Sequence, residues 1–161
     1  MKVNVKKAKP TIDWATPADL VWDGKGRSKL SKTQLNAVAT PAFYTEKITY
    51  DPEGKELLPG EHTLTATLNN TLVNDKATKT VKIIVHKAEA VLEWTDPPAQ
   101  TVEPGGAYEL DESVLKATTP AKGLKVEYDP PAGTILGPGV HELLARTAAN
   151  RTYRQTTRIV K

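Results

Sequence analysis

The chain has no cysteine. It therefore forms no disulfide, offers no thiolate nucleophile and has no cysteine-based metal site. Small secreted domains often depend on disulfides for stability. The absence therefore favours a bacterial or an intracellular protein.

Long hydrophobic runs are also lacking, and no signal peptide is visible in the sequence. No stretch approaches the ~20 apolar residues that a membrane-spanning helix needs. The first seven residues, Met1–Lys7, have no apolar core of the kind found in signal peptides. We expect no membrane insertion.

Aromatic residues are scarce, at 6% of the chain, and charge is spread unevenly. Residues 1–86 carry 13 basic and 9 acidic side chains, whereas residues 87–161 carry 9 and 10. The lysines of the first half are interleaved with acids. Nucleic-acid binders concentrate basic residues on one face, often beside stacking aromatics. The pattern predicts a solvated lysine-rich surface and no nucleic-acid partner.

What the chain does contain is an internal repeat. Four blocks occur twice in the same order, and their offset starts at 80 residues and drifts to 78 or 79. The pairs are residues 7–14 and 87–94, residues 30–37 and 110–117, residues 48–52 and 126–130, and residues 57–64 and 136–143. Such self-similarity indicates a duplication. We predict two domains, residues 1–86 and residues 87–161.

Each repeat is predicted to be all-β. Residues 11–14 and 63–68 alternate apolar and polar, and residues 80–85 are rich in β-branched side chains. Pro-Gly and Asp-Pro turn signals separate these segments. Short strands with turns at such intervals predict a β-sandwich, with Trp14 and Trp94 as the central core aromatics. Because the junction around residue 87 has no Gly, Ser or Pro run, the sequence predicts two sandwiches placed end to end with limited freedom.

One segment of each repeat breaks the strand pattern. Ser31 and Gln34 occupy the two positions of a capping box just before Leu35, and Asp111 is a candidate cap at the matching place. We expect one short helical turn in each sandwich, and no longer helix.

The two ends of the chain fall at the same point of the repeat. Residues 2–6 resemble the last strand of repeat one, and residues 156–161 match residues 80–85. We therefore expect a fragment of a longer array. The alternative is a free-standing protein whose first strand caps repeat one.

The repeats resemble the mostly bacterial immunoglobulin-like (MBG-type) tandem repeats of long surface and secreted proteins. The resemblance covers nearly the whole chain, and repeat one fits better than repeat two. It rests on the Lys-Ala-x-Pro-x-Ile-x-Trp opening at residues 7–14, on Leu-Ser-x-x-Gln-Leu-Asn-Ala at 30–37, on Tyr-Asp-Pro at 50–52 and on Leu-Pro-Gly-x-His-Thr-Leu at 58–64. It implies immunoglobulin-like sandwiches, a cell-surface or secreted location, and a non-catalytic role as spacer or adhesin segment beside neighbouring repeats.

No catalytic constellation is visible. His62 and His141 are equivalent positions of separate repeats, which favours a packing or turn role. Nucleophile, phosphate-loop and EF-hand motifs are absent. We expect neither an enzyme nor a cofactor; calcium held by glutamates near the junction is a minor alternative.

Trp22 has no counterpart in repeat two and lies next to a Gly-rich basic loop with Lys25 and Arg27. An exposed tryptophan is a common binding anchor. Core or edge packing is the default interpretation of Trp22. The competing hypothesis is a specific glycan- or protein-binding module, which a phage or injection particle could carry, with Trp22, Lys25 and Arg27 as its ligand patch.

Overall fold

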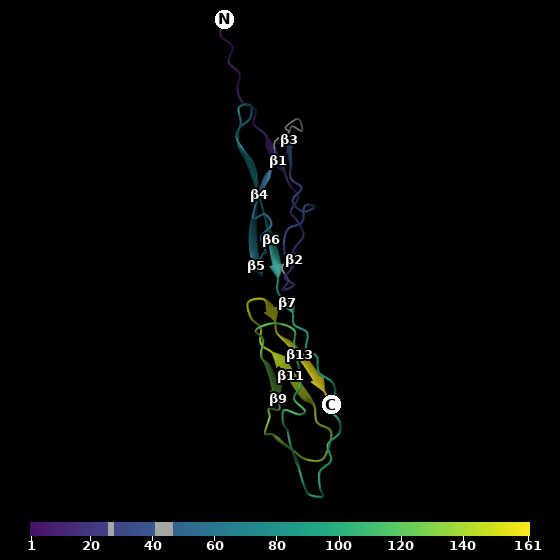
Figure 1. Cartoon of the computed structure of the whole chain (residues 1–161). Coiled ribbons are helices and arrows are strands. Elements are labelled where there is room, and N and C mark those ends of the chain that lie inside the picture. Colours follow the sequence, from purple (N-terminus) through teal and green to yellow (C-terminus); the bar gives the residue numbers. More distant parts are fainter. Residues whose placement is uncertain (26–27, 41–46) are drawn as a thin grey trace. The chain divides into compact units, whose positions relative to one another are not determined.

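The computed structural model describes residues 1–25, 28–40 and 47–161. These residues form thirteen strands and no helix, so the protein is all-β. The chain divides into two compact units, Met1–His86 (unit 1) and Lys87–Lys161 (unit 2) (Figure 1). None of the described segments forms a helix that is long and apolar enough to cross a membrane.

Unit 1 contains two sheets. Its strands are β1 (Thr11–Asp13), β2 (Leu20–Val21), β3 (Val38–Thr40), β4 (Thr49–Asp51), β5 (Gly60–Leu68) and β6 (Ala77–His86). β1 pairs antiparallel with β3, and the larger sheet has the order β2-β6-β5-β4. β2 is parallel to β6, whereas the other pairs of that sheet are antiparallel.

The core of unit 1 follows from the alternation of β5 and β6. Leu64, Ala66 and Leu68 of β5 are buried while their neighbours are more exposed, and β6 alternates in the same way. Ile12 of β1 packs into the same cluster from the other sheet. Two sheets that share one core are consistent with a β-sandwich. The segments predicted as strands at residues 63–68 and 80–85 lie in β5 and β6.

Unit 2 contains seven short strands of two to five residues. They are β7 (Ala88–Glu89), β8 (Tyr108–Glu109), β9 (Val126–Asp129), β10 (Ile135–Leu136), β11 (Leu143–Thr147), β12 (Tyr153–Arg154) and β13 (Thr156–Val160). The main sheet has the order β13-β11-β9, and β8–β10 and β7–β12 form separate pairs. An isolated bridge joins Glu93 to Thr118, in the register that Asp13 and Val38 have in unit 1.

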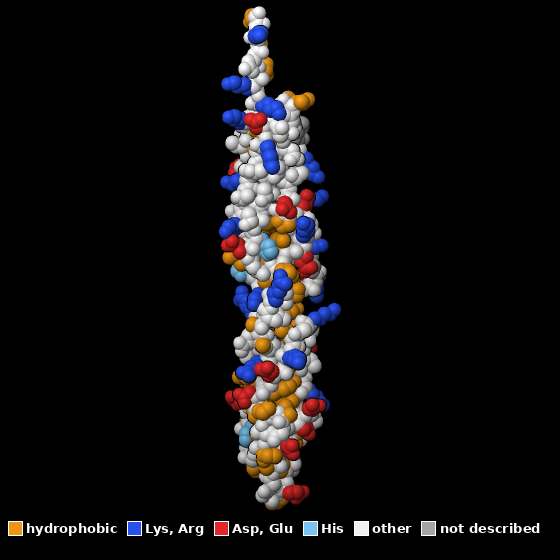
Figure 2. Space-filling model, turned by 90° about the vertical axis from the view of Figure 1, so that its left-hand side faces the viewer, with side chains coloured by type: hydrophobic (Ala, Val, Ile, Leu, Met, Phe, Trp, Pro, Cys, Tyr) orange, Lys and Arg blue, Asp and Glu red, His pale blue; other side chains and the backbone are white. Residues whose placement is uncertain are grey.

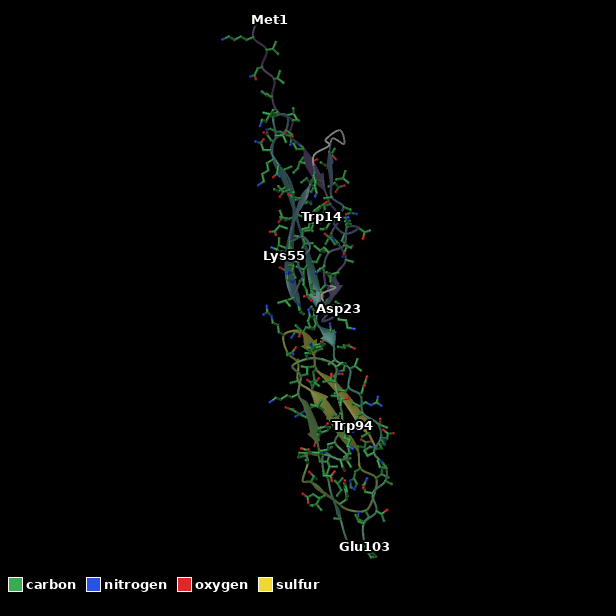
Figure 3. The ribbon with its side chains drawn as sticks, viewed as in Figure 1. Met1, Trp14, Asp23, Lys55, Trp94 and Glu103 are labelled. Carbon is green, nitrogen blue, oxygen red and sulfur yellow. The ribbon has the colours of Figure 1, made fainter. Side chains whose placement is uncertain are left out.

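Each unit is built around one buried tryptophan. Trp14 is 4% exposed and Trp94 is 5% exposed; Figure 3 marks one in each unit. The ring of Trp14 meets Tyr50 edge to face at 5.3 Å, and that of Trp94 meets Tyr128 at 5.4 Å. The predicted core aromatics are therefore in the core.

The indole N–H groups reach the segment that was expected to be helical. Trp14 Nε1 donates to the Gln34 carbonyl at 3.0 Å, and Trp94 Nε1 donates to the Val114 carbonyl at 3.1 Å. A buried indole N–H needs such a partner. In each unit the tryptophan therefore fixes where this segment lies against the core.

The predicted helical turn is not confirmed, because the structure has no helix there. In unit 1 the segment is one turn, in which the amides of Gln34 and Leu35 both donate to the Ser31 carbonyl at 3.0 Å. Half of the predicted capping box forms, since Gln34 Oε1 accepts from the Ser31 amide at 3.0 Å. The next residues return at once to extended backbone and join β3, so no second turn can follow.

Candidate functional site

The structure places Trp22 against the core of unit 1. Its backbone N–H donates to the His86 carbonyl at 2.9 Å. Its side chain is half-buried and packs on the core cluster that contains Trp14. The indole is therefore a packing element of unit 1, which weakens the hypothesis that it anchors a ligand.

The rest of the predicted ligand patch is only partly described. Lys25 is exposed, and its amide donates to Asp23 Oδ1 at 2.9 Å across a turn in which Gly24 has a φ of 68°. Figure 3 labels Asp23 in this turn. Arg27 lies outside the described residues. The patch of Trp22, Lys25 and Arg27 stays a prediction.

A polar contact holds the Trp22 segment in place. Asp19 Oδ1 accepts from the Ile84 amide at 2.7 Å, and Asp19 Oδ2 lies 3.4 Å from His86 Nε2. This carboxylate satisfies an edge amide of β6 just before β2 pairs with that strand. The sequence analysis did not single out Asp19, although a carboxylate directly before an apolar pair was a visible signal.

His62 and His141 make the same contact in their own units. His62 Nε2 lies 2.6 Å from the Leu58 carbonyl oxygen, and His141 Nε2 lies 2.8 Å from that of Gly137. Each histidine thus closes a five-residue turn that contains a glycine with a φ above 140°, Gly60 or Gly139. Only glycine adopts that backbone readily. The arrangement has the geometry of a turn clamp.

Charged side chains of the described residues form single pairs at the surface. In residues 1–25, 28–40 and 47–161 there is no group of three or more His, Asp or Glu side chains that could hold a metal ion. The exposed carboxylates instead pair singly, Glu61 with Lys82 at 2.7 Å and Glu127 with Arg146 at 3.1 Å. On the face shown in Figure 2, the basic side chains of unit 1 are scattered rather than gathered in one patch.

Unit 2 has an apolar groove that the sequence analysis missed. Its volume is about 420 Å³. It lies between the segment after Trp94 and the Pro-Gly turn before β11, and its lining includes Pro98, Val102, Tyr108 and Val140. The Pro97-Pro98 pair and the change from Trp22 to Val102 were the available signals.

Comparisons of the chain with protein-family models, with curated proteins and with solved structures find no match.

We predict that Trp22→Ala lowers the free energy of unfolding of unit 1 by about 3 kcal/mol, as expected for loss of a large packed aromatic. Lys25→Ala, on the same turn but exposed, should change it by less than about 0.5 kcal/mol. Urea unfolding followed by the remaining tryptophan fluorescence measures both. Equal stability of the Trp22→Ala variant and the parent would mean that the indole is a surface anchor after all.

A second prediction concerns Asp111, at the turn of unit 2. Hydrogen bonds from the Ser113 hydroxyl and amide hold the pKa of this carboxyl below its ordinary value of 3.8. A depressed pKa means that the carboxylate stabilises unit 2 above pH 3.8, and that this contribution is lost as the pH falls through the folded-state pKa.

An NMR titration of the Asp111 carboxyl in the parent should therefore give a midpoint below 3.8. Ser113→Ala removes the hydroxyl donor and should move the midpoint upward. An unchanged midpoint in this variant would show that the Ser113 hydroxyl does not lower the pKa of Asp111.

Proposed function

We propose that the chain is a tandem pair of immunoglobulin-like β-sandwiches that serves as a non-catalytic spacer or adhesin segment of a multidomain bacterial surface or secreted protein. The observation that carries the proposal is the repeated core, in which a buried tryptophan, a tyrosine and a turn carbonyl recur at matching positions. A duplicated unit whose matching contacts are all structural is typical of repeat architectures.

The polar contacts that recur in both units support this role. Lys7 Nζ donates to the Thr71 carbonyl at 2.6 Å, and Lys87 Nζ donates to the Asn150 carbonyl. The Ala8 amide donates to the Val73 carbonyl at 2.9 Å, and the Ala88 amide donates to the Thr152 carbonyl at 3.0 Å. These contacts fasten the first residues of each unit to a distant loop. Anchoring of the first residues suits a repeat within a longer multidomain chain, whose partners are the neighbouring repeats.

The competing proposal is a specific glycan- or protein-binding module, for which a phage or injection particle is one setting. The packing of Trp22 argues against the ligand patch predicted in unit 1. The apolar groove of unit 2 favours a binding module.

Fractionation of the source cells tests the spacer proposal. We expect antiserum raised against the chain to detect a polypeptide well above its 17.5 kDa, in the surface or culture-medium fraction. The matched control is a cytoplasmic marker on the same blot. A band near 17.5 kDa in the cytoplasm would contradict the proposal, and one on a purified particle would favour the binding module.

A further inference from the structure

The two units differ most clearly at one aligned position. Trp14 and Trp94 are 80 residues apart, as are Leu30 and Leu110, and both pairs are buried. No gap separates these landmarks, so Trp22 of unit 1 aligns with Val102 of unit 2. Trp22 packs on the core of unit 1, whereas the aligned position in unit 2 holds the smaller, half-buried side chain of Val102.

The strand beside that position also differs. In unit 1, Leu20 and Val21 form β2 and pair with the end of β6, next to the Asp19 contact. Unit 2, which is described throughout, has Ala99 at the place of Asp19, and Gln100 and Thr101 belong to no strand. The side chain of Ala99, unlike that of Asp19, has no acceptor for an edge amide of β13. The segment is therefore not held on β13 as its counterpart is held on β6.

The groove opens at this place. Its volume of about 420 Å³ is within the range of roughly 300–1,000 Å³ found for ligand pockets. Tyr108 lines one wall where unit 1 has the small, buried Ser28, and Pro98 and Val102 line the opposite segment. Val140, at 85% exposed, extends the apolar surface at the rim. The groove thus offers an aromatic ring and aliphatic faces to a flat apolar guest.

The polar groups of the rim already have partners. His141 Nε2 lies 2.8 Å from the Gly137 carbonyl oxygen, and Lys161 Nζ lies 2.9 Å from Glu142 Oε1. The Tyr108 hydroxyl is 3.4 Å from Asp111 Oδ1. A sugar, which needs several hydrogen bonds, would have to displace these contacts. An aromatic side chain would not, and stacking on tyrosine favours it.

We propose that the groove of unit 2 binds a tryptophan side chain presented by a partner polypeptide, so that the guest indole fills the space which Trp22 fills from within in unit 1. This binding role goes beyond the spacer function and does not depend on it, because a spacer repeat needs no guest. It also places a binding site in unit 2, away from the ligand patch predicted in unit 1.

The test is a titration of the intact chain with N-acetyl-L-tryptophanamide, followed by amide shifts in ¹H–¹⁵N NMR spectra. We expect saturable shifts at Val102, Leu136 and Val140, and none with N-acetyl-L-leucinamide at the same concentrations. Val102→Trp should fill the groove from within and weaken binding at least about tenfold. Leu72→Trp, which adds a tryptophan at an exposed site in unit 1, is the matched control and should bind like the parent.

Tyr108→Ser gives a second variant, since it installs the residue of unit 1 and removes the aromatic wall. It should also weaken binding. Because Tyr108 packs on the core cluster that contains Trp94, retention of the Trp94 indole N–H resonance is the check that the variant is folded. Absence of saturable shifts in the parent, or equal binding by Val102→Trp and the parent, would overturn the proposal. Saturable binding of N-acetylglucosamine in place of the tryptophan probe would overturn it too and identify a glycan site.

Discussion

The hydrogen bond from a buried indole N–H to a turn carbonyl is the constraint on which each unit depends. Burying an indole stabilises a small β-unit strongly, but its N–H must be satisfied away from water. The carbonyls of Gln34 and Val114 supply that partner, so the turn must pass directly beside the ring. The tyrosine that packs on the ring then bonds to the chain just after the turn, at Ala37 or Ala117. One aromatic pair thereby positions the turn and strands on both sides of the core.

The two units share the contacts around their central aromatic residues and differ at the edge of the core. Both keep the histidine clamp beside a glycine of unusual backbone, at Gly60 and Gly139. They differ at the Trp22 and Val102 position, which lies at the margin of the core rather than at its centre. Trp14 and Trp94 are buried in both units, so the central aromatic core is present whichever side chain stands at this position. At this edge of the core, one unit can gain a binding role that the other unit lacks.

Much of the fold could be predicted from the sequence because its strongest signals are local. Period-2 alternation located β5 and β6, and the repeated Trp-containing block located both core aromatics. The helical turn is not confirmed, because Ser31 and Gln34 form only half of a capping box and the chain joins β3 shortly after this turn. A capping motif reports how a helix begins and says nothing of its length.

The candidate site was harder to predict, because it depends on contacts between distant segments. Core or edge packing was the default expectation for Trp22, and the Gly-rich basic sequence beside it left an exposed anchor as the alternative. The contact that holds its segment joins Asp19 to Ile84 of β6, 65 residues farther along the chain. The groove of unit 2 lies where that contact is absent and where Val102 takes the place of Trp22. A comparison of the two repeats position by position would have indicated it, whereas a search for known motifs could not.

The central claim is that an indole hydrogen bond holds the core of each unit together. Hydrogen exchange of the indole N–H protons of Trp14 and Trp94 tests it most directly. The account predicts that the N–H protons of Trp14 and Trp94 exchange only through opening of their whole unit, with protection close to the free energy of unfolding. It also predicts that Tyr50→Phe and Tyr128→Phe each lower the protection in their own unit and leave the other unchanged. Rapid exchange at either Trp14 or Trp94 in the parent would contradict it, because the indole hydrogen bond would then not hold the core of that unit.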